Sequence, residues 1–593
     1  MADSYDYIVV GAGTSGCIVA SRLSEDPRVR VLLVEAGGSD RNPIITMPGA
    51  LPFVYQNKRI GWGYQSGPEP FAHGKTVDEK AGKVLGGSSS INAMIFNRGN
   101  PLDFQGWAAD GLDQWGYASV LPYFRKMESF SEGANEWRGG EGPVHVTRAR
   151  AAHQFYDAFL RSGEQAGFSV SPDHNAYRQE GLHVAQSFID RGVRWSAPRA
   201  YLKPAAGREN LTILLRRTVK RIVVDSGVAQ GIEIQEGDRT RIIACNREVI
   251  VCAGAMNTPK LLMLSGIGPV EELRRHNIAV AAEAEGVGRN LQNHPGVDIQ
   301  FATAREDSLT SELGMIGRAR LGADWLLRRK GLGTTNFFET GAFLKTREDV
   351  DYVNMQYEFL PLTRRLHRGK VVPIPGFQFW MDLARPKSRG TVTLRSANPA
   401  DHPVTIFNHL EHRQDLQDLV DGVRLALDLV KQPAWQKFNP TNLSLGQGTP
   451  SNTDLEAFVR KHVGTSYHPS GTCSMGVDGD AVVDQDGKVY AVGNLRVADA
   501  SIMPKIITGN LNAAVMMMAE KIADHIRGVP ALPPSNAKYH QASGNRTEAA
   551  VDKPRGFRRL PGLQDGLNES TGSARHQHNL AENVMDPTKR GAV

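Results

Sequence analysis

A chain of 593 residues with 40% apolar and 22% charged residues can bury a large core, but it exceeds the size at which one core usually keeps growing. We therefore expect two domains that share one site. The net charge of +6 does not gather in one helix or stripe, which argues against nucleic-acid binding, and four cysteines without a CxxC pair argue against a disulfide scaffold or a cysteine metal site.

The first predicted element is a βαβ unit, YDYIVVGAGTSGCIVASRLSEDPRVRVLLVEAGG. Gly11, Gly13 and Gly16 form G-x-G-x-x-G between its first strand and its helix, where glycines allow a tight turn, close approach of a pyrophosphate and helix packing. Glu35 ends the second strand, where an acid accepts ribose hydroxyls and disfavours NADP. The unit predicts a dinucleotide site for FAD or NAD, and the alternative is a glycine-rich turn without a ligand.

The N-terminus does not resemble a targeting segment. An acidic, polar leader precedes the first apolar run, without a basic region or a small-residue cleavage site. No window approaches the roughly 18 uninterrupted apolar residues that a membrane-spanning helix needs. We expect a cytoplasmic protein, because few cysteines suit a reducing compartment. Peripheral contact with a membrane stays open.

Further elements follow along the chain. Residues 37–99 are dense in Gly, Pro and Ser and predict loops that wrap a ligand. LTILLRRTVKRIVVD, GIEIQ and REVIVCAGA predict strands that return to the first sheet, whereas FQFWMDLARP, GTVTLRS and the amphipathic DLQDLVDGVRLALDLVKQ predict a second, substrate-facing domain. A strand, a turn and a terminal helix end the folded part near residue 530, beyond which the polar composition predicts flexibility.

Four separated blocks resemble the glucose-methanol-choline (GMC) family of FAD oxidoreductases, and the resemblance spans residues 5 to about 528. The blocks are KVLGGSSSINAMIFNRG, GAMNTPKLLMLSGIGP, WGYASVLPYFRKME, and YHPSGTCSMG together with NLRVADASIMPKIITGNLNAAVMMMAEKIAD. The resemblance implies an α/β fold, in which a Rossmann-like FAD-binding domain (1–150, 196–302 and 462–530) carries an α+β substrate-binding domain (151–195 and 303–461). Residues 531–593 would form a flexible tail.

The resemblance also implies the cofactor contacts. The expected FAD-binding residues are Gly11, Gly13, Gly16, Glu35, Val84, Gly86, Gly87, Ser88, Asn92, Ala93, Val219, Asp499 and Asn510. Val219 also suits an ordinary strand position, and Asp499 also suits a turn or a helix N-cap. Some members tether FAD through a histidine, but the corresponding position here is Ile91, which has no nucleophilic nitrogen. We therefore expect noncovalent FAD.

Alcohol oxidation requires a base at the hydroxyl while the flavin takes the hydride. His468 matches the family's base, and an imidazole that titrates near neutrality suits that task. Asn510 matches the family's second active-site position, and an amide there can orient the substrate oxygen but cannot act as a base. The resemblance therefore implies one main base.

Substrate contacts are expected from two further segments. Glu339, in NFFETGAF, matches the position at which choline-oxidising relatives place an acid, and Phe338 lies beside it. A carboxylate with aromatic faces attracts a quaternary ammonium, so choline is a candidate. The alternative is a Glu339 bonded to backbone or to His468, with phenylalanine in the core. Tyr467 either walls the pocket or packs.

The sequence leaves the redox partner open. The leading hypothesis is an alcohol dehydrogenase that passes electrons to a quinone or another carrier, and the nearest rival is an oxidase that uses oxygen. An FAD-containing lyase, a flavoprotein without turnover and an NAD-linked dehydrogenase are three further hypotheses. The identity of the alcohol and the oligomeric state are not specified by the sequence.

Overall fold

A mostly parallel sheet forms the first half of the fold. The computed structural model describes residues 4–237, 239–304, 307–367, 370–446 and 448–541. The strands run in the order β11-β2-β1-β14-β13-β12, and β27 pairs with β14. Their bounds are β1 Ser4–Val10, β2 Val31–Glu35, β11 Leu211–Leu215, β12 Thr218–Asp225, β13 Val228–Glu236, β14 Arg239–Val251 and β27 Leu495–Val497. Helix α1 (Thr14–Leu23) links the parallel strands β1 and β2, as the βαβ prediction requires.

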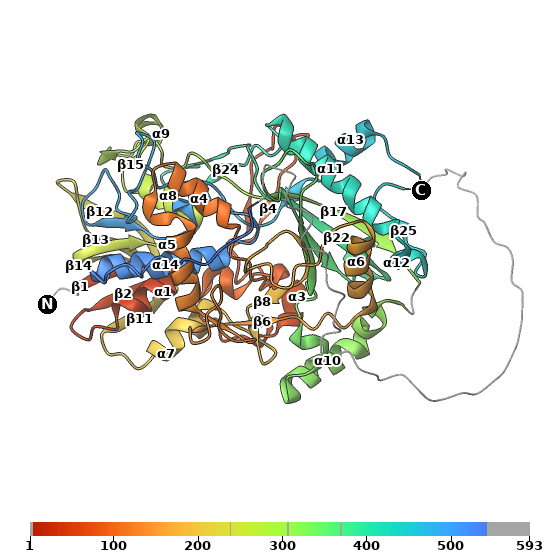
Figure 1. The fold of residues 1–593 in the computed structure, drawn as a ribbon. Coiled ribbons are helices and arrows are strands. Elements are labelled where there is room, and N and C mark those ends of the chain that lie inside the picture. Colours follow the sequence, from red (N-terminus) through yellow and green to blue (C-terminus); the bar gives the residue numbers. More distant parts are fainter. Residues whose placement is uncertain (1–3, 238, 305–306, 368–369, 447, 542–593) are drawn as a thin grey trace, which may run out of the picture. The chain divides into compact units, whose positions relative to one another are not determined.

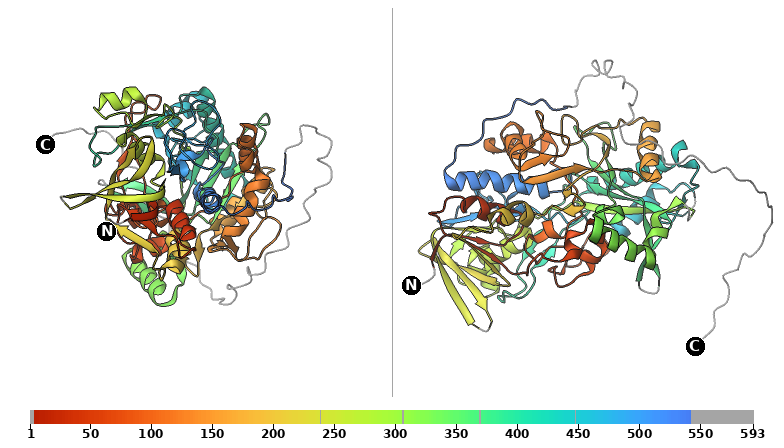
Figure 2. Two further views of the ribbon diagram at one scale, coloured as in Figure 1. Left: turned by 90° about the vertical axis from the view of Figure 1, so that its left-hand side faces the viewer. Right: turned by 90° about the horizontal axis from the view of Figure 1, so that it is seen from below.

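Helices from distant parts of the chain cover this sheet. Helix α14 (Asn512–Arg527) packs beside α1 and α5 (Tyr117–Met127), as Figure 1 shows. Strand β2 is buried along its whole length, which explains its continuous apolar run VLLVE. The antiparallel strands β12 to β14 extend one end of the layer (Figure 2).

The second sheet is antiparallel and separates an apolar face from a polar one. Its order is β25-β17-β22-β19-β18-β7, and β26 pairs with β17. The bounds are β7 Gly181–Val184, β17 Pro295–Ala302, β18 Thr340–Leu344, β19 Met355–Leu360, β22 Gly376–Leu383, β25 Thr441–Asn442 and β26 Gly464–Thr465. Helices α6 (Gln154–Gln165), α11 (Arg413–Val430) and α13 (Asn452–His462) pack on its apolar face. Period-two alternation, as in FQFWMDL, produces the two faces.

The remaining helices and strands lie outside the two large sheets. The helices are α2 Pro43–Thr46, α3 Leu51–Gln56, α4 Pro101–Ala109, α7 Lys203–Ala205, α8 Gly254–Leu264, α9 Val270–Arg275, α10 Met315–Arg328 and α12 Pro433–Gln436. The short strands include β3 Tyr64–Gln65, β4 Asp78–Glu79, β5 Glu128–Phe130, β6 Val144–Arg148, β20 Thr363–His367, β21 Lys370–Ile374, β23 Thr391–Thr393 and β24 Val404–Ile406. The predicted loop region 37–99 indeed holds only short elements.

Two predicted boundaries differ from the strand pairing. Strands β17 and β26 lie in segments assigned to the first domain, yet β17 pairs with β22 and β26 pairs with β17 in the second sheet. The reason is that the alternating sequence PGVDIQFA suits a half-polar antiparallel strand.

The predicted tail begins later than residue 531. The segment 531–541 is hydrogen-bonded to the body of the protein: Ser535 N donates to Ala118 O, and His540 N donates to Tyr177 O. Trp137 Nε1 donates to Lys538 O at 2.8 Å. The prediction of a flexible tail is therefore wrong for these residues, and residues 542–593 lie outside the described part of the chain.

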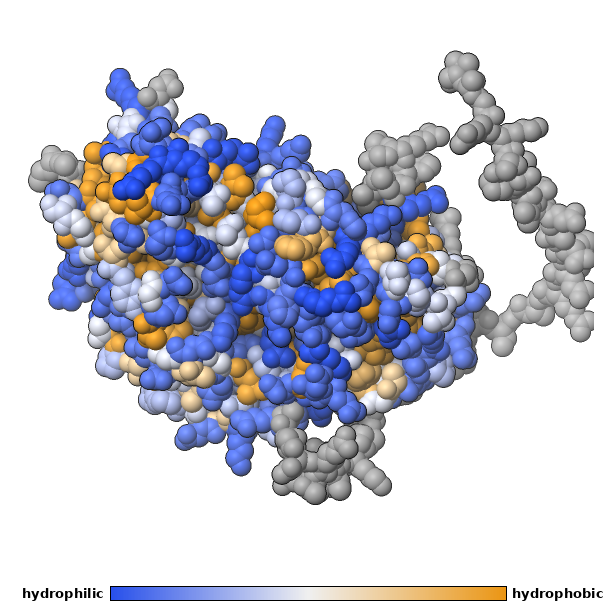
Figure 3. Space-filling model, turned by 90° about the horizontal axis from the view of Figure 1, so that it is seen from above, coloured by the Kyte–Doolittle hydropathy of each residue, from blue (hydrophilic) through white to orange (hydrophobic). Residues whose placement is uncertain are grey.

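In the part of the chain that the structure describes, no helix is both long and apolar enough to cross a bilayer. On the face in Figure 3, apolar side chains lie in small groups among hydrophilic ones.

Candidate active site

One cavity of about 1170 Å³ reaches from the glycine turn after β1 to the polar face of the second sheet. Thirteen of the predicted site residues line it: Gly11, Gly13, Glu35, Gly87, Ser88, Asn92, Ala93, Val219, Phe338, Tyr467, His468, Asp499 and Asn510. The cavity is large enough for a ligand of more than drug size, which suits a dinucleotide with a small substrate. Gly16, Val84, Gly86 and Glu339 do not line it.

The three glycines of the first turn each meet a different steric requirement, as expected for the motif. Gly11 has a φ of +97°, and a Cβ there would lie 2.5 Å from Cys252 O. A Cβ on Gly16 would lie 1.9 Å from Gly11 O, so this glycine lets the helix pack. Gly13 faces open space, since its Cβ would meet only Cys252 O, at 3.8 Å. Gly13 is also the N-cap of α1 without a side-chain cap, which leaves backbone N–H groups for a phosphate.

A second glycine loop closes on the first. Gly86 N donates to Ala12 O at 2.7 Å, and a Cβ on Gly87 would lie 2.8 Å from Gly13 Cα. Gly86 and Gly87 have φ values of +92° and +51°, which favour glycine. The two loops therefore form one cradle that only small residues permit. Val84, two residues before Gly86, is buried.

Two of the predicted acids, Glu35 and Asp499, line the cavity. Glu35 accepts hydrogen bonds from Ala12 N at 2.9 Å and Gly37 N at 2.7 Å, and burial raises its pKa to about 7. Asp499 caps a 3₁₀ turn through Ser501 N and also accepts from Gly254 N and Thr258 Oγ1. Asp499 therefore caps the turn and also lines the cavity. These residues fit a bound FAD.

Gly13 offers a direct test of the cradle. Gly13→Ala is expected to fold, because the added methyl meets no atom closer than 3.8 Å, but to weaken FAD binding at least about tenfold, because it fills space needed by the pyrophosphate. Fluorescence titration of the apoprotein with FAD measures the change. Gly106→Ala in α4, where a Cβ meets nothing within 4 Å, is the matched control. Unchanged FAD affinity in Gly13→Ala would contradict this placement of the pyrophosphate.

His468 is held between two partners that fix its tautomer. Asn510 Nδ2 lies 3.3 Å from His468 Nε2, and His294 Nδ1 lies 2.9 Å from His468 Nδ1. Asn510 Nδ2 also donates to Glu358 Oε1 at 3.1 Å, so the amide nitrogen faces both groups. An amide nitrogen only donates, so His468 Nε2 is the acceptor and Nδ1 carries the proton. His468 Nδ1 then donates to His294 Nδ1.

Both imidazoles are neutral around pH 7. Burial, reinforced by the neighbouring His294, holds the pKa of His468 well below its usual value. Burial likewise lowers the pKa of His294 to about 4. A neutral His468 with a lone pair on Nε2 is ready to accept a proton in the cavity.

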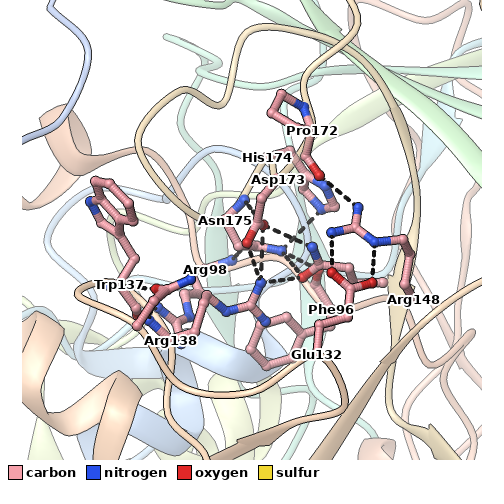
Figure 4. A network of polar contacts seen from close by, with 12 residues as sticks. Phe96, Arg98, Glu132, Trp137, Arg138, Arg148, Pro172, Asp173, His174 and Asn175 are labelled. Atoms are coloured by element: carbon pink, nitrogen blue, oxygen red, sulfur yellow. Dashed lines mark hydrogen bonds and ion pairs between the residues drawn. The ribbon is translucent and has the colours of Figure 1, made fainter. Parts of the chain in front are cut away.

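Asn510 is oriented by a buried network. Its Oδ1 accepts from Asn97 Nδ2 at 2.5 Å, and Asn97 Oδ1 lies 2.9 Å from His174 Nε2. Asp173, the residue before His174, accepts from the buried Arg138 (Figure 4). Because Asn510 Oδ1 is bonded on this side, its Nδ2 is directed at Glu358 and His468.

Glu339, the acid that was expected to face the substrate, does not line the cavity. Glu339 Oε2 accepts from Ala151 N at 2.8 Å. This geometry agrees with the second hypothesis for Glu339, in which it binds backbone. Glu358, on β19, lines the cavity instead, and Phe338 and Tyr467 also line it. Tyr467 has a φ of +64°. Its ring packs edge-on against the ring of Tyr55, with 5.9 Å between the ring centroids.

Sequence reasoning missed His294, Glu358 and Asp382. Glu358 and Asp382 lie on the polar face of the strands MQYEFL and FQFWMDL, whose alternate residues on the opposite face enter the core. Acids at polar positions of strands that are buried on both faces are rare, and this pattern could have identified them. His294 carried no comparable signal, because a single histidine before a strand is common.

The comparisons with known proteins come from sequence and from structure. The profiles described as GMC oxidoreductase match residues 5–296 and 386–519. The oxygen-dependent choline dehydrogenase of Brucella canis is 43% identical over 533 residues, which cover 90% of this chain and 97% of the relative. The Pseudomonas aeruginosa protein of that name is 44% identical over 549 residues, covering 91% and 98%.

Solved structures share the fold. A variant of formate oxidase from Aspergillus oryzae RIB40 has a TM-score of 0.83 at 27% identity, covering 89% of this chain and 98% of the other. Pyridoxine 4-oxidase from Mesorbium loti has a TM-score of 0.79 at 27% identity, covering 89% and 100%.

Proposed function

The chain belongs to the GMC oxidoreductase family, and on this premise we propose that it oxidises an alcohol that carries a cationic nitrogen, with choline as the reference compound. The protein is an FAD-dependent oxidoreductase that acts on CH–OH donors and passes electrons to an acceptor. The proposal of a cationic alcohol rests on the relatives named for choline and on the carboxylate of Glu358 in the cavity.

We assign the cofactor to the glycine cradle. Gly11, Gly13 and the α1 N-terminus would hold the pyrophosphate, Glu35 the ribose, and Gly87 with Ser88 the flavin side. When bound, the flavin accepts the hydride from the carbinol carbon. Ile91 lines the cavity at the position where relatives with a histidine attach FAD, so denaturation should release the flavin intact.

His468 is the proposed base, and the observation that carries this role is its fixed tautomer beside Asn510. The substrate hydroxyl would donate to His468 Nε2, in place of the long 3.3 Å contact with Asn510 Nδ2. The proton moves from the hydroxyl to Nε2 as the hydride leaves the carbon. Asn510 stabilises the developing alkoxide as a donor, and the Glu358 carboxylate, 3.1 Å from Asn510 Nδ2, favours the imidazolium that forms.

The substrate assignment is tested by anaerobic mixing of the holoenzyme with choline, followed by flavin absorbance. We expect bleaching of the flavin, because hydride transfer needs no external acceptor. A lyase would leave the flavin oxidised while consuming its substrate. Unbleached flavin with choline and with other amino alcohols would contradict the proposed function.

For the acceptor we propose oxygen, supported by the relatives named oxygen-dependent and by the oxidases among the structural neighbours. One observation favours a membrane quinone as a second candidate. Helix α10 lines the cavity through Leu321 and Trp325 and exposes Ile316 and Leu327, 86% and 82% of whose surfaces are accessible. Exposed Arg320 lies on the same helix, as expected for contact with an anionic bilayer.

Vesicle binding separates these candidates. If α10 contacts a membrane, the holoenzyme should sediment with phosphatidylserine-containing vesicles, and replacing both Ile316 and Leu327 with glutamate should release it, because each substitution removes apolar burial and adds repulsion. Zwitterionic vesicles are the control. Equal sedimentation of wild type and variant would exclude α10 as the membrane-binding surface. Oxygen uptake during choline oxidation would then identify oxygen as the acceptor.

A further inference from the structure

Two acids share the polar face of the second sheet beside the proposed base. Glu358 on β19 pairs with Trp380 on β22, and Asp382 on β22 pairs with Gln356 on β19, so the acids are diagonal neighbours on one face. Glu358 lines the cavity, and Asn510 joins it to His468. The acids therefore lie on the substrate side of the cavity.

Each acid has one oxygen bonded and one without a donor. Glu358 Oε1 accepts from Gln356 Nε2 at 3.2 Å and from Asn510 Nδ2 at 3.1 Å, whereas no described residue donates to Oε2. Asp382 Oδ1 accepts from Trp380 Nε1 at 2.6 Å and from Ser466 Oγ. Asp382 is 1% exposed, and its Oδ2 has no partner in the described part of the chain. Unpaired buried acceptors cost stability, so such a site is typical of a binding function.

The groups facing this pair do not neutralise it. His468 and His294 are neutral around pH 7, and Tyr467 is an uncharged phenol. Arg364 on β20 also lines the cavity, but its nearest acid is Asp298, at 4.0 Å. The described residues thus form no ion pair with Glu358 or Asp382. A positive charge to balance these acids would therefore have to come from a ligand.

We propose that Glu358 and Asp382 form a subsite for the protonated amine of an amino alcohol, which donates an N–H to Glu358, and that the enzyme prefers such substrates to quaternary ones. This inference rests on the proposed alcohol oxidation. A carboxylate oxygen without a donor gains a charge-assisted hydrogen bond from an ammonium N–H, whereas the methyl groups of choline supply only charge. Asp382, the diagonal neighbour of Glu358 on the same face, adds a second carboxyl oxygen without a donor among the described residues.

The pair also links substrate binding to pH. Burial raises the pKa of Glu358 to about 7, and burial with the nearby Glu358 raises the pKa of Asp382 well above its usual value. Below pH 7 Glu358 is protonated and attracts a cation weakly. The kcat/KM of an amino alcohol should therefore rise as pH increases through about 7, until the amine itself loses its proton. His468 does not titrate in this window, because its pKa is far lower.

The test uses four alcohols of matched shape with the holoenzyme. These are N,N-dimethylethanolamine, its neutral isostere 3-methylbutan-1-ol, choline, and its neutral isostere 3,3-dimethylbutan-1-ol. We expect dimethylethanolamine to exceed its carbon isostere by at least about tenfold in kcat/KM, and to exceed choline, because only it donates an N–H. The pH profile of dimethylethanolamine should rise through about pH 7, and that of 3-methylbutan-1-ol should not.

Glu358→Gln should remove the preference for the amine over its isostere and flatten the rise with pH, and Asp382→Asn should weaken the preference. Glu339→Gln is the matched control, since Glu339 lies outside the cavity lining, and it should keep the preference. Bound-flavin absorbance verifies that each variant folds.

Three results would overturn the subsite. The first is a kcat/KM for choline equal to or above that for dimethylethanolamine. The second is a preference for dimethylethanolamine over 3-methylbutan-1-ol that survives in both Glu358→Gln and Asp382→Asn. The third is loss of this preference in Glu339→Gln alone. If wild type oxidises the neutral alcohols but not the amine, the subsite fails while alcohol oxidation stands. If it oxidises none of the four, both fail.

Discussion

Replacing His468 with alanine is expected to leave FAD bound and to lower the rate of flavin reduction by about 10² to 10⁴, the usual cost of losing a general base. The cofactor should remain because the glycine cradle and Asp499 lie on the other side of the cavity from the second sheet and do not bond to this imidazole. Anaerobic stopped-flow reduction by dimethylethanolamine and by choline measures the loss.

The control for this variant is His462→Ala, at the exposed end of α13. It removes an imidazole of the same size from a site without contact to the cavity, so it should keep wild-type reduction. Near-normal reduction by His468→Ala would reject His468 as base and transfer that role to Glu358, whose pKa of about 7 also suits proton transfer.

His294→Ala is expected to lower flavin reduction by about tenfold to a hundredfold, because it removes the acceptor that holds the proton of His468 on Nδ1. His468 could then carry its proton on Nε2, which would donate instead of accepting. The same tautomer logic applies to other imidazole bases whose second nitrogen is bonded.

A rescue variant separates this positioning role from simple packing. His294→Asn places an amide oxygen where Nδ1 lies and should recover much of the rate, while His294→Leu, of similar volume, should not. Thermal unfolding and FAD content are compared across the three variants. Equal loss in His294→Asn and His294→Leu would show that this buried histidine only fills space.

The glycine turns of the site could be predicted because the residues that form each turn lie close together in the sequence. Gly11, Gly13 and Gly16 lie within six positions, so the spacing of the motif is enough to identify them. The second glycine loop and the His468 region were also located, through the family resemblance. These segments place backbone and short side chains, so their roles follow from residue type and spacing.

The acids of the second sheet could not be predicted from the sequence, because their proximity depends on which strands pair. Glu358 and Asp382 meet only because β19 and β22 are neighbours in one register, which no short motif records. Glu339 was assigned to the substrate by resemblance, but in the fold the backbone of Ala151 takes its carboxylate. The predicted boundary near residue 302 differs from the strand pairing for the same reason, since β17 pairs with β22 in the second sheet.

The first sheet contains strands and covering helices from both ends of the folded chain, β1 with α1 and β27 with α14. A polypeptide emerging from the ribosome lacks β27 and α14 until about residue 527 has been made. Since α14 packs directly on α1, the helix whose N-terminus faces the cavity, a nascent chain holds the glycine turn without its support. Capture of the cofactor is thus expected to follow synthesis, and C-terminal truncations within α14 should accumulate as colourless protein.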